Sequence, residues 1–296
     1  MSFNENRRLD PSQVQDRRGR RSSGRTIAFG GGGLGIVVLV IYMLLGGNPS
    51  DLVGTDTGSS SSSDGYYENA TDIESQCQTG ADANERQDCR LVGFVNSVQA
   101  YWTDTFPEYG KTYVSAQTVL YSGSTDGACG FASSAMGPFY CPSDQMVYVD
   151  LSFFNTTMQT QFGTEGGPYA EAYVIAHEYG HHVQNLFGVL NTTGRIQDTG
   201  PDSDIVFTEL QADCLAGIWF NHATETGYIT GLTREDINQA LEAVIAVGDD
   251  RIQKQSQGYV VPDAWTHGSS EQRLAALVDG MKSGDVDTCN TPGWDE

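Results

Sequence analysis

Residues 172–184 read A-Y-V-I-A-H-E-Y-G-H-H-V-Q and contain three of the five histidines of this 296-residue chain. The apolar residues that lead into the run predict a buried setting, where an unpaired polar side chain is costly. The histidines therefore need partners, and their spacing indicates which. His177 and His181 stand four positions apart, so on a helix both imidazoles lie on one face and can reach a single ion.

His177, Glu178 and His181 form an H-E-x-x-H sequence, which on a helix is the zinc-binding motif of metalloproteases. Zinc in a catalytic site takes three protein ligands and a water, and it lowers the pKa of that water to about 7. Glu178 stands where the general base of such sites stands. The motif predicts one Zn2+ per chain and a hydrolase, although manganese and cobalt accept overlapping ligand sets.

The third ligand has four candidates outside the motif: Glu209, Asp213, His222 and His267. A histidine six positions after His181, as some zinc peptidases have, is excluded because Phe187 stands there. We expect Glu209 to be the ligand, since two histidines and one glutamate are an established catalytic set.

Glu209 lies 28 residues beyond His181, in the apolar run E-L-Q-A-D-C-L-A-G-I-W of residues 209–219. Asp213 follows one helical turn after Glu209, so its carboxylate can accept the free N–H of a ligating histidine and fix that ring's tautomer. His182 is off the ligand face because adjacent helix positions diverge. We expect His182 to face solvent or to support a ligand.

The periodicity and the capping residues predict an α+β fold: a mainly helical body with a small β-sheet. The expected helices cover residues 91–104, 168–187, 205–226, 234–247 and 270–282, and the expected strands cover residues 112–121 and 145–150. The Gly- and Pro-containing residues 122–142, with a cysteine near each end, are expected to form a loop between those strands.

The N-terminal part divides into three segments of different composition. Residues 1–25 carry seven arginines and three acids, and we assign them to a basic cytoplasmic tail. Residues 26–47 contain no charge between positions 27 and 45, which is long enough for an N-terminal transmembrane helix. Residues 48–65 are a Gly/Ser-rich linker. The remaining residues 66–296 form the catalytic domain.

The arginines before the apolar segment predict a single-pass protein of the cell membrane with its catalytic domain on the extracytoplasmic side. A cleaved signal peptide is the alternative. No small-x-small cleavage site follows closely after Leu45, so we favour an uncleaved anchor.

All six cysteines follow the apolar segment: Cys77, Cys89, Cys129, Cys141, Cys214 and Cys289. An even number in an exported domain fits three disulfides in an oxidising compartment. Sequence proximity favours the pairs Cys77–Cys89 and Cys129–Cys141, which leaves Cys214 for Cys289.

The composition excludes nucleic acid as a partner. The chain has 16 Lys and Arg against 38 Asp and Glu, a formal charge of −22, whereas nucleic-acid binding rests on basic side chains that neutralise phosphates. The sequence predicts no particular oligomeric state.

Four stretches together resemble the bacterial neutral zinc metallopeptidase family: residues 172–184, residues 209–219, G-P-F-Y-C-P at 137–142 and H-G-S-S-E-Q-R at 267–273. The opening R-R-L-D-P-S-Q-V-Q-D-R-R-G of residues 7–19 is similar to the N-terminus of that family, more loosely. The resemblance covers the chain except for the Ser-rich linker. It implies a membrane-anchored peptidase with a zincin-like fold.

A more distant resemblance is to the gluzincin membrane proteases of the prenyl-protein-processing and heat-shock-induced types. In those proteases an E-x-x-A-D-like helix and a later histidine, with an arginine six residues on, follow the H-E-x-x-H motif. The resemblance implies that His267 stabilises the oxyanion of the tetrahedral intermediate and that Arg273 orients carboxylates or substrate. Gly268 stands where those proteases usually have proline.

We therefore expect a zinc-dependent peptidase that hydrolyses exported or cell-envelope polypeptides through a metal-bound water activated by Glu178. Two alternatives keep the metal: an inactive zinc-binding envelope scaffold, and a metal-dependent amidase that acts on cell-wall peptide bonds. An intact Glu178 argues against the scaffold, because a purely structural site has no need of a base.

Overall fold

The computed structural model describes residues 2–19, 73–158, 166–190 and 198–289. Its helices are α2 (Ile73–Gln76), α3 (Gly80–Glu85), α4 (Gln87–Thr105), α6 (Pro168–Phe187), α8 (Asp204–His222), α9 (Arg234–Ala246), α10 (Asp249–Gln257) and α11 (Ser270–Ser283). Its strands are β1 (Ser2–Phe3), β2 (Val14–Asp16), β3 (Gln117–Tyr121), β4 (Ser124–Gly127), β5 (Gly130–Ser133), β6 (Phe139–Cys141), β7 (Met146–Asp150) and β8 (Ile229–Gly231).

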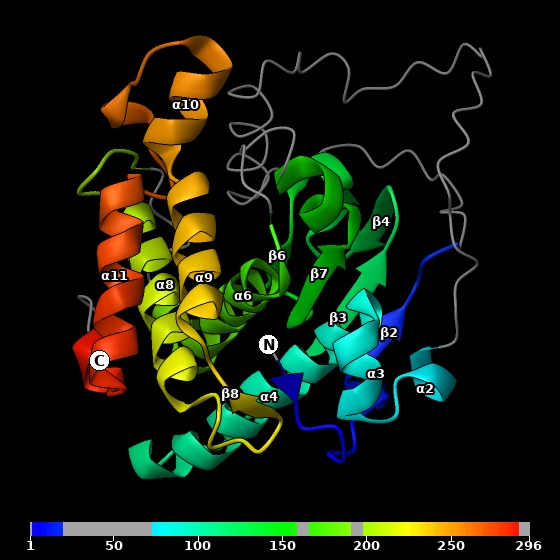
Figure 1. Ribbon diagram of the computed structural model, residues 1–296. Helices are drawn as coiled ribbons and strands as arrows, with labels where there is room; N and C mark the ends of the chain where they lie inside the picture. The colour runs from blue at the N-terminus through cyan, green and yellow to red at the C-terminus, as the bar shows by residue number, and fades with distance from the viewer. Residues whose placement is uncertain (1, 20–72, 159–165, 191–197, 290–296) are drawn as a thin grey trace, which may run out of the picture.

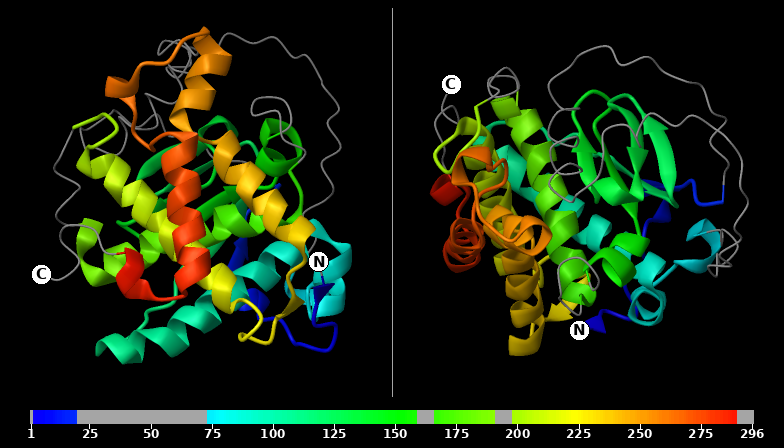
Figure 2. Two further views of the ribbon diagram at one scale, coloured as in Figure 1. Left: turned by 60° about the vertical axis from the view of Figure 1, so that its left-hand side comes forward. Right: turned by 90° about the horizontal axis from the view of Figure 1, so that it is seen from above.

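Helix α6 lies between two parts of the molecule. Helices α8 and α9 pack on one side of it, with α11 packed on both of them, and a sheet whose edge strand β6 contacts α6 lies on the other side (Figures 1 and 2). Helix α4 crosses beneath and also packs on α6. The mixed α+β architecture with a mainly helical body is as expected. Two of the largest buried side chains, Phe94 of α4 and Trp219 of α8, contact each other edge to face where these helices meet.

Local sequence explains why α6 begins and ends where it does. Pro168 occupies its first turn, where the missing N–H costs nothing. Gly188 closes the helix with a φ of 93°, a left-handed conformation that glycine adopts without strain. All nine residues from 172 to 180 are buried. The predicted helix 168–187 is confirmed at both ends, and it presents its histidines inside the protein.

The other predicted helices are confirmed with shifted ends. The helix expected over 205–226 begins at Asp204, where the Ser203 hydroxyl accepts the backbone N–H of Val206, but it ends at His222. Helices α9 and α11 carry the capping boxes that the sequence suggested, at Thr233 and Ser269.

The main sheet has the strand order β2-β3-β7-β6. Strand β3 pairs in parallel with β2 and β7, whereas β6 runs antiparallel to β7. Alternate side chains of β3 enter different clusters: Leu120 joins the main core, and Val119 and Tyr121 join a small cluster on the opposite face. The sheet is thus buried on both faces.

Two sequence predictions in this region are wrong. The strand expected from residue 112 begins only at Gln117, because side chains bind the preceding backbone: Gln99 accepts the N–H of Ala116, and His182 bonds the carbonyl of Val114. The expected loop 122–142 contains the β4–β5 hairpin and β6. These strands are only three or four residues long, and two of them contain glycine, so they show no alternation of apolar and polar residues that would predict them.

The assignment of residues 1–25 to a separate tail is also wrong for the part that the structure describes. Residues 2–19 belong to the body: β1 pairs with β8, and β2 forms one edge of the main sheet (Figure 1). The expected anchor, residues 26–47, lies outside the described residues. Within the described ranges, no helix combines the length and the apolarity needed to span a membrane.

Helix α8 packs very closely on α11 through glycines. A Cβ added to Gly217 would lie 2.2 Å from the backbone oxygen of Leu277, and one added to Gly280 would lie 2.0 Å from that of Cys214. Side chains at these positions would force the two helices apart. The glycines therefore fix the position of α8, which carries Glu209 and Asp213, relative to α11, which carries Arg273.

We expect Gly217→Ala to destabilise the fold by about 1–3 kcal/mol, the usual cost of overpacking. The matched control is Gly231→Ala, where an added Cβ has no atom within 4 Å. Thermal unfolding of the two variants checks this. An equal midpoint for both would contradict the close packing of α8 and α11.

Candidate metal centre

Three side chains from α6 and α8 converge at the point where these helices cross. The Nε2 atoms of His177 and His181 lie 3.2 and 3.5 Å from the carboxylate oxygens of Glu209. One ligand atom from each residue lies within 4.8 Å of the others, and no fourth His, Cys, Asp or Glu of the described chain joins the group. His181 and Glu209 remain partly exposed, so solvent reaches the site.

Glycine again allows this approach. Gly180, the fourth residue of the H-E-x-x-H motif, faces α8, and a Cβ at this position would lie 2.9 Å from the backbone oxygen of Ala212. The short contact brings the α8 backbone against the α6 backbone. It therefore places Glu209 within reach of both histidines.

The tautomer of His177 follows from its partner on the other ring nitrogen. Its Nδ1 lies 2.8 Å from Oδ1 of Asp213, a fully buried carboxylate that can only accept. Nδ1 therefore carries a proton whether the ring is neutral or charged, and Nε2 is the nitrogen at which a metal would replace the second proton.

A chain of buried amides sets the tautomer of His181. The backbone oxygen of Cys289 can only accept, so it orients the Gln211 amide that donates to it at 3.0 Å. Gln211 Oε1 then accepts from Gln184 Nε2 at 2.9 Å, and the Thr208 carbonyl accepts from the same nitrogen at 2.7 Å. Gln184 Oε1 is left facing His181 Nδ1 at 2.8 Å. Nδ1 therefore donates, and Nε2 is free for a metal.

The resulting donor set fits a zinc ion. Two imidazole nitrogens and a carboxylate face one point, an arrangement that needs a cation between them, either a proton or a metal ion. Burial lowers the pKa of His177, but Asp213 and Glu209 outweigh it and raise that pKa to about 10. Burial raises the pKa of Glu209, but the charges of His181 and His267 hold it well below its usual value. The surroundings therefore favour positive charge at this point.

Asp213 is held by two further groups. Arg273 of α11 donates to both its oxygens, from Nε at 2.8 Å and from Nη2 at 3.0 Å. Tyr173 donates its hydroxyl to Oδ1 at 2.6 Å and accepts from Arg273 Nη2 at 2.9 Å. Burial raises the pKa of Asp213, but the charges of Arg273 and His177 outweigh burial and lower that pKa to about 2. The carboxylate stays ionised and keeps the His177 ring in place.

We expect Gln184→Leu to weaken zinc binding about 10- to 100-fold, the usual effect of losing a partner of a ligating histidine. The matched control is Gln99→Leu, which removes another buried amide with several hydrogen bonds, on α4 and away from the metal centre. Zinc affinity of the refolded variants, measured by competition with a chelator, distinguishes them. Equal affinities would show that the amide chain does not position His181.

Glu178 and His267 occupy the surroundings of this group. Glu178 is buried beside the two histidines, and burial raises its pKa. His267 precedes α11, with its Nδ1 2.8 Å from Thr266 Oγ1 and 3.4 Å from Asp249 Oδ1. Burial lowers the pKa of His267, but Glu209 and Asp249 raise it overall. His267 and Glu209 therefore interact electrostatically.

Asp249 was missed by sequence reasoning. Its Oδ2 accepts the backbone N–H groups of three successive residues, Thr266, His267 and Gly268, at 2.7, 2.7 and 3.1 Å. It thus fixes the loop that carries His267. Gly268 has a φ of 92°, which proline cannot adopt, and this explains the departure from the gluzincin pattern at that position.

The structure brings together all the residues that the sequence selected, except His222 and His182. His222 lies at the far end of α8, where its Nδ1 faces Glu225. The expectation for His182 is wrong: it is fully buried, and it bonds Tyr140 and the Val114 carbonyl. Besides Asp249, sequence reasoning missed several supporting side chains: Tyr173, Gln184 and Gln211. Only Tyr173 left a signal, one helical turn before His177.

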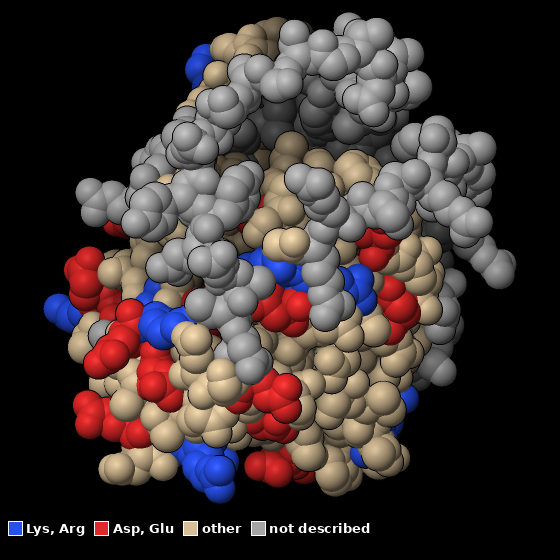
Figure 3. Space-filling model, turned by 90° about the vertical axis from the view of Figure 1, so that its right-hand side faces the viewer, with Lys and Arg blue, Asp and Glu red and all other residues tan. Residues whose placement is uncertain are grey.

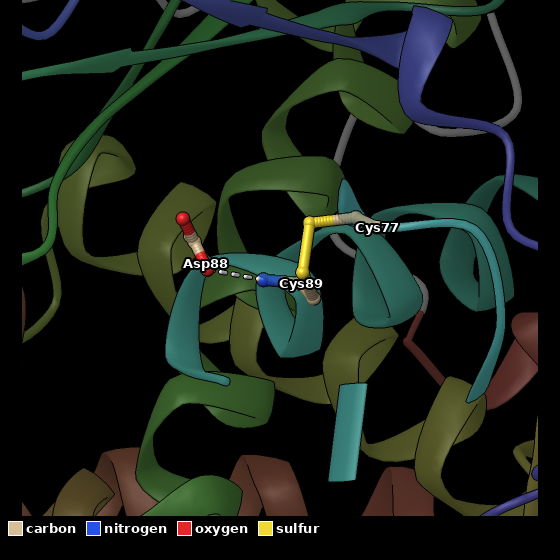
Figure 4. Close-up of side chains that lie close together, drawn as sticks. All are labelled: Cys77, Asp88 and Cys89. Carbon is tan, nitrogen blue, oxygen red and sulfur yellow. Dashed lines mark hydrogen bonds between the residues drawn. A yellow bond between two sulfur atoms is a disulfide. The ribbon is translucent and has the colours of Figure 1, made fainter. Parts of the chain in front are cut away.

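A second group with metal-ligand chemistry, Cys77, Asp88 and Cys89, is not a metal site (Figure 4). The two sulfurs form a disulfide, so they offer no thiolate. Asp88 instead accepts from Arg18 and Arg86. The other disulfides are Cys129–Cys141 and Cys214–Cys289, so all three expected pairs are confirmed.

The structure thus combines an H-E-x-x-H helix with a second helix that supplies a glutamate, which is the three-ligand set of catalytic zinc sites. The chain belongs to the family described as Putative neutral zinc metallopeptidase, whose model matches residues 1–292. It is 49% identical over 226 residues to Uncharacterized protein Rv2575 of Mycobacterium tuberculosis, covering 73% of this chain and 74% of that protein. It is 38% identical over 299 residues to Uncharacterized protein YpfJ of Escherichia coli, covering 97% of each. No solved structure matches the chain.

Proposed function

We propose that this protein is a zinc-dependent peptidase with His177, His181 and Glu209 as its metal ligands and Glu178 as its general base. One observation carries the proposal: two histidine Nε2 atoms and the Glu209 carboxylate face one solvent-accessible point beside Glu178. Three protein ligands with an open position are typical of catalytic zinc, whereas structural zinc has four.

Each surrounding residue has a role in peptide hydrolysis. Bound zinc supplies a Lewis acid that polarises the substrate carbonyl and makes water acidic enough to react near neutral pH. Glu178 accepts a proton from the attacking water and passes it to the leaving amine, a task that suits a buried carboxyl with a raised pKa. His267 donates a hydrogen bond to the oxyanion of the tetrahedral intermediate, held in place by Asp249.

Asp213 and Arg273 act through His177. The carboxylate accepts the Nδ1 proton, and the guanidinium keeps that carboxylate ionised and fixed. A ligand ring held in this way loses little freedom on metal binding, and its Nε2 becomes a better donor.

The substrate class follows from the compartment. Three disulfides among six cysteines are typical of an oxidising compartment outside the cytoplasm. We therefore propose exported or cell-envelope polypeptides as substrates, with residues 27–45 as the point of membrane attachment.

The test compares three substrates under one set of conditions. The full chain, loaded with zinc, is incubated with a diverse unfolded peptide library, with a folded protein, and with purified cell wall, and new termini are read by mass spectrometry. Cleavage of the peptides that stops when a chelator removes zinc supports the proposal. Release from cell wall alone would instead indicate an amidase, and no product from any substrate at full zinc occupancy would indicate a scaffold.

A further inference from the structure

The first residues of the chain are built into the fold at the level of single side chains. Phe3 is buried to 1% exposure against α4, where Gly93 makes room for its ring. The three atoms nearest to a Cβ added at Gly93 all belong to Phe3, the closest at 2.5 Å. Gly80 of α3 similarly allows the backbone of Asn4 to approach, because a Cβ there would lie 2.1 Å from the Asn4 oxygen.

Two asparagines of the body bind this segment as a partner strand would. Asn84 accepts the backbone N–H of Phe3 at 2.8 Å and donates to its carbonyl at 3.1 Å. Asn96, which is 1% exposed, accepts the N–H of Asp10 at 2.7 Å and donates to its carbonyl at 3.0 Å. Loss of the segment would leave buried polar groups without partners, which is costly.

Strand β2 completes the contact. It pairs in register with β3, with Val14 opposite Thr118 and Asp16 opposite Leu120. Arg18 then bonds both Asp16 and Asp88, next to the Cys77–Cys89 disulfide. On the face that includes this region, acidic and basic side chains lie side by side (Figure 3). Without β2, an edge of β3 would be left unpaired and open to aggregation.

We propose that residues 2–19 remain on the same side of the membrane as the metal centre, as a structural part of the catalytic domain. A segment that contributes buried side chains, a strand and an ion pair to the body cannot lie across a bilayer from it. Residues 27–45 are just long enough for one crossing, and one crossing would put residues 2–19 opposite the body. The chain therefore does not have the single-pass topology that the N-terminal arginines predict.

Sided labelling tests this directly in intact cells that express the full chain. All six native cysteines form disulfides, so one added cysteine is the only free thiol. Glu5→Cys reports on the N-terminal segment and Glu235→Cys on the catalytic domain, and both positions are exposed. We expect a membrane-impermeant maleimide to label both cysteines before lysis, or to label both only after lysis. Labelling of one before lysis and of the other only after it would overturn the proposal.

A double-mutant cycle gives a second test on the purified full chain in detergent. In an α-helix, replacing glycine with alanine is ordinarily stabilising. With Phe3 docked, Gly93→Ala should instead lower the thermal midpoint by several degrees, and in the Phe3→Ala background it should raise the midpoint. The same stabilising effect of Gly93→Ala in both backgrounds would show that Phe3 does not lie on α4.

Discussion

Glu178→Gln is expected to lower kcat/KM for peptide cleavage by about 100- to 10,000-fold, the range that general acid–base catalysis contributes. The amide has nearly the shape of the carboxylate, but it cannot accept a proton from water. Glu178 is not one of the three proposed ligands, so zinc should still bind at one per chain. Steady-state kinetics and metal analysis of the same sample check both parts.

The matched control for this variant is Glu242→Gln, the same substitution at an exposed position on α9. It should cleave like the wild type. Equal activity of Glu178→Gln and the wild type would contradict the role of Glu178 as a base. Loss of zinc along with activity would mean that Glu178 contributes to metal binding.

Asp213→Leu is expected to destabilise the fold by about 3–5 kcal/mol, because it leaves the buried Arg273 guanidinium without its counter-charge. It should also weaken zinc binding about 10- to 100-fold, because His177 loses the acceptor that fixes its ring. Denaturant unfolding of the metal-free protein and chelator competition measure the two effects separately.

A double variant separates these effects. Asp213→Leu combined with Arg273→Met removes both charges, and replacing a buried pair with apolar side chains is often neutral for stability. We expect it to recover most of the lost stability while zinc binding stays weak. Recovery of zinc affinity along with stability would mean that Asp213 supports the fold and does not position His177.

The centre of the site could be predicted because it depends on the spacing of residues within single helices. His177 and His181 share a helix face by spacing alone, and Glu209 with Asp213 repeats that relation on a second apolar helix. The crossing of these two helices was not predictable from periodicity. It depends on Gly180 against Ala212, a contact between residues far apart in the chain.

The remaining features depend on tertiary contacts in the same way. The side chains of Gln184 and Gln211 orient the His181 ring only because the Cys289 carbonyl orients the Gln211 amide. Asp249 begins a short helix and shows its role only when the 266–268 loop folds over it. Residues 1–25 as a whole have the composition of a basic tail, and nothing in the periodicity of residues 2–19 indicates that α4 and β3 bind them.

The most direct measurement is a crystal structure of the zinc-loaded full chain, with anomalous diffraction data collected at the zinc edge. We predict a single peak bonded to His177 Nε2, His181 Nε2 and Glu209 at about 2.0–2.2 Å, with water in the remaining position near Glu178. A zinc ion bound elsewhere would contradict this ligand assignment. A fourth protein ligand that closes the coordination sphere would also contradict it, because zinc would then be structural.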